Sequence, residues 1–116
     1  MEEFITLYRP IGLQELELIA QTDYREFPPR LPEQPIFYPV LDEKYAALIA
    51  RYWSIKHESR VNYVTRIQVK KEFLDLYEVQ FVGSSVNKEY RIPAEDLPEF
   101  NRNIVGKIEV IAEFHP

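Results

Sequence analysis

Three side chains that could carry chemistry lie far apart in the chain, at Arg9, Tyr38 and Glu89. The alternation of an extended segment places Arg9 on the same side as Ile5 and Leu7, which should face the core. A guanidinium on a covered face needs an anionic partner, from the protein or from a ligand. We therefore expect Arg9 to make either a structural ion pair or a contact to a phosphate or ribose group.

Glu89 belongs to a second candidate group. In a strand, Asn87, Glu89 and Arg91 share one face, opposite their apolar neighbours. A carboxylate and an amide two residues apart could grip ribose hydroxyls and stabilise positive charge that develops on a sugar ring. A solvated strand face would show the same pattern, so both interpretations stay open.

Two aromatic and two basic residues complete the set of candidates. Tyr38 ends an apolar run and Tyr45 falls in the first turn of an expected helix, so each could stack on a flat ligand ring or pack in the core. Arg25 and Arg30 flank two prolines. A loop stiffened in this way could hold arginines at a cleft, or bind a partner through its polyproline geometry.

Hydrophobic periodicity and proline positions predict the elements that must position these residues. We expect a strand over 4–8 that Pro10 and Gly12 terminate, a helix over 13–22, and an irregular segment over 24–35. Asp42 suits the N-cap of a second helix. The apolar face of that helix is expected to comprise Tyr45, Leu48, Ile49, Tyr52 and Trp53, and three alanines, Ala46, Ala47 and Ala50, would allow it to approach a sheet closely.

The second half of the chain favours strands. Alternation predicts strands over 63–69, 78–82, 89–92 and 108–114, with helical turns over 71–76 and from residue 93 onward. The predicted fold class is therefore α+β, a single domain with a split, mostly antiparallel β-sheet and two N-terminal helices.

Composition excludes several classes of protein. A chain of 116 residues suffices for one domain, and the absence of cysteine excludes disulfides and thiolate chemistry. The net charge of −5 argues against a protein that coats duplex nucleic acid. His57 and His115 form no metal motif, so no metal is expected. With no secretory signal and no membrane-spanning apolar run, we expect a cytoplasmic protein without a membrane partner.

The residues also resemble a known family. Leu7-Tyr8-Arg9, a helix, and then Ile36-Phe37-Tyr38 before the helix that begins Asp42-Glu43-Lys44-Tyr45-Ala46-Ala47 resemble the N-terminal half of the ADP-ribosyltransferase fold. Asn87-Lys88-Glu89 resembles its later glutamate-bearing strand. The segments FPPRLPEQPIFYPVL and IPAEDLPEFNRNIVG are similar to short bacterial and phage-associated proteins that carry the label "ADP-ribosylation/crystallin J1".

This resemblance implies a role for each matching residue. Arg9 would hold the ribose or phosphate of NAD, Tyr38 would stack beside nicotinamide and Tyr45 would support the pocket. Glu89 would stabilise the oxocarbenium-like sugar as nicotinamide leaves, and Asn87 would lie near the acceptor. The implied function is transfer of ADP-ribose from NAD, as substrate, to an unknown protein, nucleic-acid or small-molecule acceptor.

Two alternatives stay open beside the transferase. One is a non-catalytic relative of the same fold that binds a nucleotide or a partner protein, for example in phage–host conflict. The other is a small interaction domain that uses the proline-rich loop. Under the first two hypotheses, Arg9 and Glu89 are expected to line one shared groove.

Overall fold

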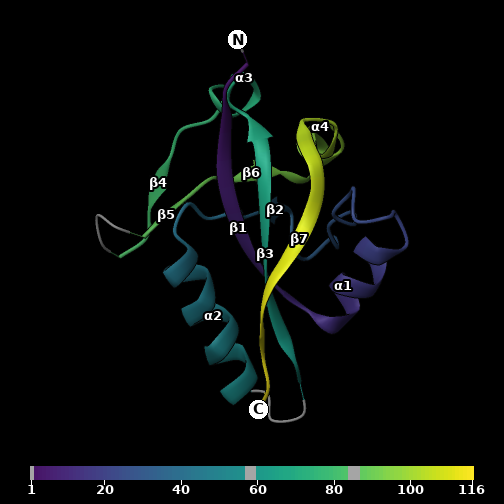
Figure 1. The fold of residues 1–116 in the computed structure, drawn as a ribbon. Coiled ribbons are helices and arrows are strands. Elements are labelled where there is room, and N and C mark those ends of the chain that lie inside the picture. The colour runs from purple at the N-terminus through teal and green to yellow at the C-terminus, as the bar shows by residue number, and fades with distance from the viewer. Residues whose placement is uncertain (1, 57–59, 84–86) are drawn as a thin grey trace.

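Three long strands form the central sheet of the structure (Figure 1), a computed structural model that describes residues 2–56, 60–83 and 87–116. The strands are β1 (Phe4–Gly12), β3 (Asn62–Lys70) and β7 (Ile104–Phe114), antiparallel and in the order β1-β3-β7. The remaining elements are short, apart from one helix. The fold is a compact single α+β domain, and this part of the prediction is confirmed.

Strand β1 runs past the proline that was expected to end it. Pro10 pairs with Val64 of β3 and lies inside the strand. The backbone N–H and C=O of Tyr8 both bond to Val40, on the side away from β3. Two residues later, the nitrogen of Pro10 points to that same outer edge, where no ladder bond is lost. The expectation that Pro10 terminates the strand is therefore wrong.

Four short strands extend the structure beside the central sheet. β2 (Ile36–Phe37) pairs with β6 (Ile92–Pro93), and β4 (Gln80–Phe81) pairs with β5 (Lys88–Glu89). Val40 links the two parts, because it forms antiparallel bridges with Tyr8 on one side and Glu89 on the other. The strand expected over 89–92 is thus divided between two separate pairs.

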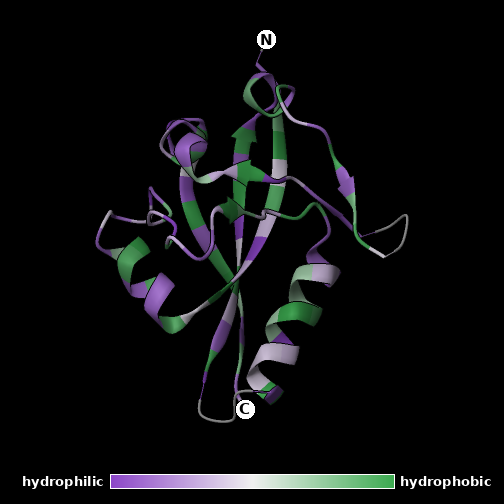
Figure 2. Ribbon diagram, turned by 180° about the vertical axis from the view of Figure 1, so that it is seen from behind, coloured by the Kyte–Doolittle hydropathy of each residue, from purple (hydrophilic) through white to green (hydrophobic). Residues whose placement is uncertain are grey.

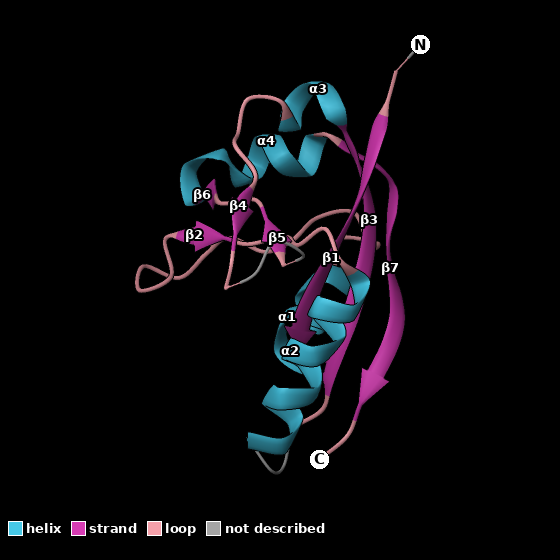
Figure 3. Ribbon diagram, turned by 90° about the vertical axis from the view of Figure 1, so that its left-hand side faces the viewer, coloured by secondary structure: helices cyan, strands magenta, loops and turns pink. Residues whose placement is uncertain are grey.

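The two longer helices lie beside one half of the twisted central sheet, and the short helices lie beside the other half. Helix α1 (Leu13–Ala20) and helix α2 (Glu43–Lys56) lie on either side of the lower half of the sheet (Figure 1). The short helices α3 (Lys71–Leu74) and α4 (Leu97–Arg102) and the 3₁₀ turn η1 (Ala94–Asp96) lie beside the upper half, with the short strands (Figure 3). These positions agree with the helices that periodicity predicts.

Two groups of buried residues lie on opposite faces of the sheet. The larger joins α1, the proline-rich segment and the upper helices to one face, and includes Leu7, Ile11, Ile19, Phe27, Phe37, Ile67, Val69 and Phe100. The smaller lies under α2 and consists of Val40, Ala46, Ala50 and Val64. Tyr63, Ile67 and Val69 of β3 belong to the larger group, as alternation predicts.

Helix α2 begins after Asp42, whose Oδ1 accepts a hydrogen bond from the backbone N–H of Lys44 at 3.1 Å. The close approach of alanines to the sheet is confirmed for Ala46 and Ala50, whereas the expected face of large apolar residues is only partly covered. The buried residues are Ala46, Ala50 and Ser54, whereas Leu48 is 65% exposed. Small side chains let the helix approach the sheet closely, while Leu48, Tyr52 and Ile55 remain exposed. Hydrophobic and hydrophilic residues alternate along the ribbon of α2 (Figure 2).

The alternation expected for β7 is interrupted. Ile108 is buried, but Val110 is 42% exposed. Register shifts occur along the β3–β7 ladder, and Gly106 within β7 has φ +76°. The shift between Val110 and Ala112 moves the last residues of β7 to the other face, so Ile108 lies in the larger buried group while Ala112 and Phe114 pack against the smaller one. No helix within the described part of the chain is long and apolar enough to cross a bilayer.

Candidate functional site

Arg9 is held in a bidentate ion pair. Its Nε lies 2.9 Å from Oε2 of Glu15, and its Nη2 lies 3.1 Å from Oε1 of the same carboxylate. Glu15 sits in the first turn of α1, which begins directly after β1 and so returns the carboxylate to the strand. The side chain of Arg9 is only 9% exposed and that of Glu15 is 20% exposed. Of the two contacts expected for Arg9, the structure contains the ion pair with the protein.

A second arginine joins this pair across an aromatic ring. The guanidinium carbon of Arg9 lies 4.5 Å from the centroid of the Phe37 ring, and that of Arg30 lies 5.9 Å from the same centroid. Phe37 is buried on β2 against Phe27 and Phe100. The electron-rich face of an aromatic ring attracts a nearby cation and so stabilises the charged form of each guanidinium. We name Arg9, Glu15, Arg30 and Phe37 the arginine cluster.

The arginine cluster carries more positive than negative charge. Two guanidinium groups share the single carboxylate of Glu15. Nη2 of Arg30 donates to Oε1 of Gln34 at 3.3 Å, but its Nε is buried and makes no hydrogen bond within the described part of the chain. Burial, and then the positive charge of Arg9, lower the pKa of Arg30 from its usual value. An anion placed here would supply the missing acceptor and offset the surplus charge.

The proline-rich segment brings Arg30 to the arginine cluster. The side chain of Asn101 on α4 bonds to both backbone groups of Phe27, accepting from its N–H and donating to its C=O, each at 3.0 Å. Phe27 is thereby anchored in the core three residues before Arg30. The other arginine of this segment, Arg25, is more than half exposed and pairs with Asp23 at 3.8 Å. The structure thus places only one of the two candidate arginines in the cluster.

Tyr38 lies at the border of the arginine cluster. It follows Phe37 directly and is 41% exposed. Its phenol is close enough to influence the pKa of Arg30. An exposed aromatic ring near the guanidinium of Arg30 offers a surface on which a flat ligand ring could stack. Arg9 and Arg30 thus meet at the ring of Phe37, and Tyr38 lies near Arg30.

Glu89 does not lie in this group. Residues directly opposite each other in a β-ladder point to the same face. Tyr8 pairs with Val40, and Val40 pairs with Glu89, so these three side chains share the α2 face of the sheet. Arg9, one residue from Tyr8, points to the opposite face. The expectation that Arg9 and Glu89 line one shared groove is wrong for this geometry.

Glu89 instead belongs to a separate small group. It is 8% exposed, and its Oε2 lies 3.0 Å from Nε of Arg91. Tyr45 of α2 lies on the same face, where burial and then the negative charge of Glu89 raise the pKa of the phenol. Asn87 lies just before β5, and its backbone C=O accepts from the N–H of Val82 at 2.8 Å. The expected pocket residues are thus divided between two faces.

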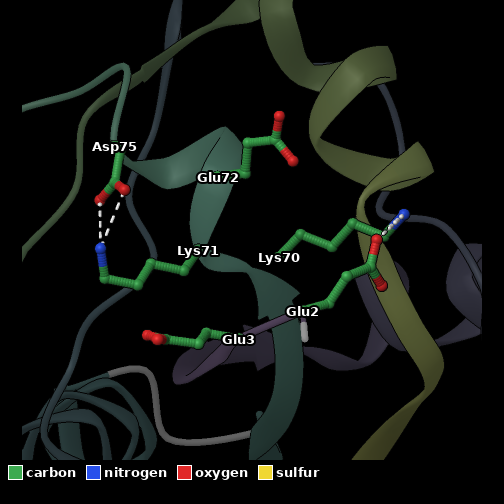
Figure 4. Close-up of a pocket in the computed structure, with 6 residues that line it drawn as sticks. All are labelled: Glu2, Glu3, Lys70, Lys71, Glu72 and Asp75. Carbon is green, nitrogen blue, oxygen red and sulfur yellow. Dashed lines mark hydrogen bonds and ion pairs between the residues drawn. The ribbon is translucent and has the colours of Figure 1, made fainter.

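Two hollows of the surface are lined by no member of either group. The larger, of about 510 Å³, is lined by charged side chains at the N-terminal end of β1 and around α3 (Figure 4). Its lysines are paired there, Lys70 with Glu2 at 3.5 Å and Lys71 with Asp75 at 2.9 Å. The smaller, of about 210 Å³, lies between the proline-rich segment and α4. Among the described residues, no group of three His, Asp or Glu side chains could hold a metal ion.

Two members of the arginine cluster, Glu15 and Phe37, were not predicted as site residues from the sequence. Glu15 had a usable signal, because an acidic residue in the first turn of a helix that directly follows a strand can fold back onto an arginine near the end of that strand. His57, named above, lies outside the described residues.

The chain matched no protein-family model, no curated protein and no solved structure.

Proposed function

We propose that the protein is a nucleotide-binding module that holds the phosphate groups of its ligand at the arginine cluster. The observation that carries the proposal is the pair of guanidinium groups on one buried ring, with the carboxylate of Glu15 paired to Arg9 and the buried Nε of Arg30 lacking an acceptor among the described residues. Arginine is well suited to phosphate, since its planar donors match two oxygens at once.

NAD or ADP-ribose is the candidate ligand. Its two phosphates would lie against Arg30 and the donors of Arg9 that Glu15 leaves free. A base or nicotinamide ring would stack on Tyr38, whose ring is exposed beside Arg30. This assignment rests on the family resemblance together with the chemistry of the arginine cluster. It corresponds to the non-catalytic hypothesis drawn from the sequence.

Transfer of ADP-ribose would need a carboxylate beside the ribose. Glu89, the residue that the resemblance assigns to this role, lies on the other face and pairs with Arg91. We therefore propose binding without transfer. In an assay for free nicotinamide, the protein should release none above the rate of the buffer. Glu89→Gln should leave the Kd for NAD within about twofold of wild type, because a residue on the opposite face contributes little.

Isothermal titration calorimetry with NAD and with inorganic pyrophosphate tests the proposal. Arg30→Gln should weaken binding of both about tenfold or more, because a hydrogen bond to a charged group contributes about 1.5–3 kcal/mol. Arg25→Gln removes the same charge from the same segment, outside the arginine cluster, and should leave the Kd unchanged. Absence of binding by wild type, or equal effects of the two substitutions, would rule out this site.

A further inference from the structure

Helix α2 leaves a hydrophobic face uncovered. Leu48 is 65% exposed, Tyr52 is 59% exposed and Ile55 is 69% exposed. Spacings of four and three residues place these side chains together on one face of a helix. We name Leu48, Tyr52 and Ile55 the α2 stripe. Helical spacing places it opposite the small residues that bury the helix against the sheet.

The helix cannot hide the α2 stripe by turning about its axis. Oγ of Ser54 donates to the C=O of Phe114 at 2.9 Å and accepts from Nδ2 of Asn62 at 3.0 Å. Ala50, one turn earlier, and Ala46, two turns earlier, are fully buried. Rotation would break these bonds, and it would force large side chains into a space that fits methyl groups. The exposure of the α2 stripe therefore follows from how the helix is attached.

The α2 stripe is flanked by positive charge on a protein of net charge −5. Lys44, Arg51 and Lys56 are exposed on α2, against the single carboxylate of Glu43. Arg51 lies with its guanidinium carbon 5.7 Å from the centroid of the Phe114 ring. The helix thus carries a local charge opposite to that of the whole chain. An apolar stripe flanked by positive charge favours a partner surface that is apolar with acidic residues beside it.

We propose that the α2 stripe docks an acidic amphipathic helix of another protein. Apolar side chains of that helix would cover the α2 stripe, and acidic residues beside them would meet Lys44, Arg51 and Lys56. A second copy of this chain is disfavoured as the occupant, because α2 against α2 would oppose like charges. An anionic membrane is disfavoured by the net negative charge of the rest of the molecule. This inference goes beyond the proposed function and uses none of its residues.

A designed peptide pair tests the charge preference. One peptide is an amphipathic helix of about 18 residues with a leucine stripe and glutamate flanks, and the other has lysine in place of glutamate. Fluorescence anisotropy gives the Kd of each for the full-length protein. The acidic peptide should bind at least about tenfold more tightly than the basic one, and 0.5 M salt should weaken its binding.

Substitutions locate the binding surface. The double variant Leu48→Ser with Ile55→Ser should weaken binding of the acidic peptide about tenfold or more. Leu76→Ser is the matched control, since Leu76 is 75% exposed away from α2, and it should bind as wild type does. Because all three side chains are exposed, each variant should stay folded, with an unfolding temperature lowered only by the weaker helix propensity of serine in α2, and circular dichroism checks this.

Four results would overturn the inference. The first is equal affinity of the protein for the acidic and the basic peptide, and the second is unchanged binding of the acidic peptide by the Leu48 and Ile55 double variant. The third is that the free protein sediments as a dimer and that the double variant does not. The fourth is that the protein pellets with phosphatidylserine vesicles but does not bind the acidic peptide. The last two results would assign the α2 stripe to a second copy or to a membrane surface.

Discussion

Replacement of Glu15 by glutamine should lower stability and at the same time tighten anion binding. In the wild type, the carboxylate of Glu15 takes two hydrogen bonds from Arg9, at 2.9 and 3.1 Å. Glutamine keeps one acceptor but loses the charge, so Arg9 is left 9% exposed without an anion. A phosphate bound at the arginine cluster would no longer face a negative neighbour.

The size of both effects follows from this geometry. Loss of one partner from a fully buried pair costs about 3–5 kcal/mol; because Glu15 keeps 20% exposure, we expect a loss of about 2 kcal/mol in the free energy of unfolding. That corresponds to a fall of about 8 °C in the unfolding midpoint. A unit charge about 6 Å from a bound phosphate, at an effective dielectric constant of about 40, contributes about 1.4 kcal/mol. Pyrophosphate should therefore bind about tenfold more tightly.

Urea unfolding and calorimetry with pyrophosphate measure the two effects on the same variant. Glu17→Gln is the matched control, because Glu17 is exposed on the same helix and should change neither quantity. Weaker pyrophosphate binding by Glu15→Gln would refute the arginine cluster as an anion site. An unchanged free energy of unfolding would show that the ion pair contributes nothing to the fold.

Three further predictions concern the scaffold. In urea unfolding, Leu48→Ala should change the free energy of unfolding by less than about 0.5 kcal/mol. Ala50→Leu should lower it by about 1–3 kcal/mol, because the site of Ala50 is fully packed. A larger loss for Leu48→Ala than for Ala50→Leu would mean that the other face of α2 is buried. The pKa of Tyr77 is raised to about 12 by burial and then by its hydrogen bond to Asp96, so the proton is held more tightly in the folded state. The stability that this phenol contributes is complete below pH 10 and is lost as the pH rises towards 12. In Tyr77→Phe, the free energy of unfolding should therefore fall less steeply with pH in this range than in wild type. An equally steep fall would contradict the raised pKa of Tyr77. Asn101→Ala removes two bonds to the proline-rich segment and should cost about 1–2 kcal/mol in thermal unfolding, while a midpoint equal to wild type would mean that the segment is anchored elsewhere.

The sequence alone determined most of the secondary structure. A proline fixes its own φ and keeps the preceding residue out of the helical region, so the irregular segment between α1 and β2 could be recognised without tertiary information. Alternation in β3 and the capping residue Asp42 before α2 are equally local signals. The requirement that Arg9 find an anionic partner also followed from its position on a covered face.

Only the tertiary structure decided which surfaces meet. From the sequence, α2 has a face of large apolar residues and also alanines that allow close approach to a sheet, but only the packed structure shows that the face with Ala46 and Ala50 is the buried one. The bridges through Val40 decided that Glu89 shares the side of Tyr8 and not that of Arg9. Ladder partners and packing distances involve residues remote in the chain, and no local pattern encodes them.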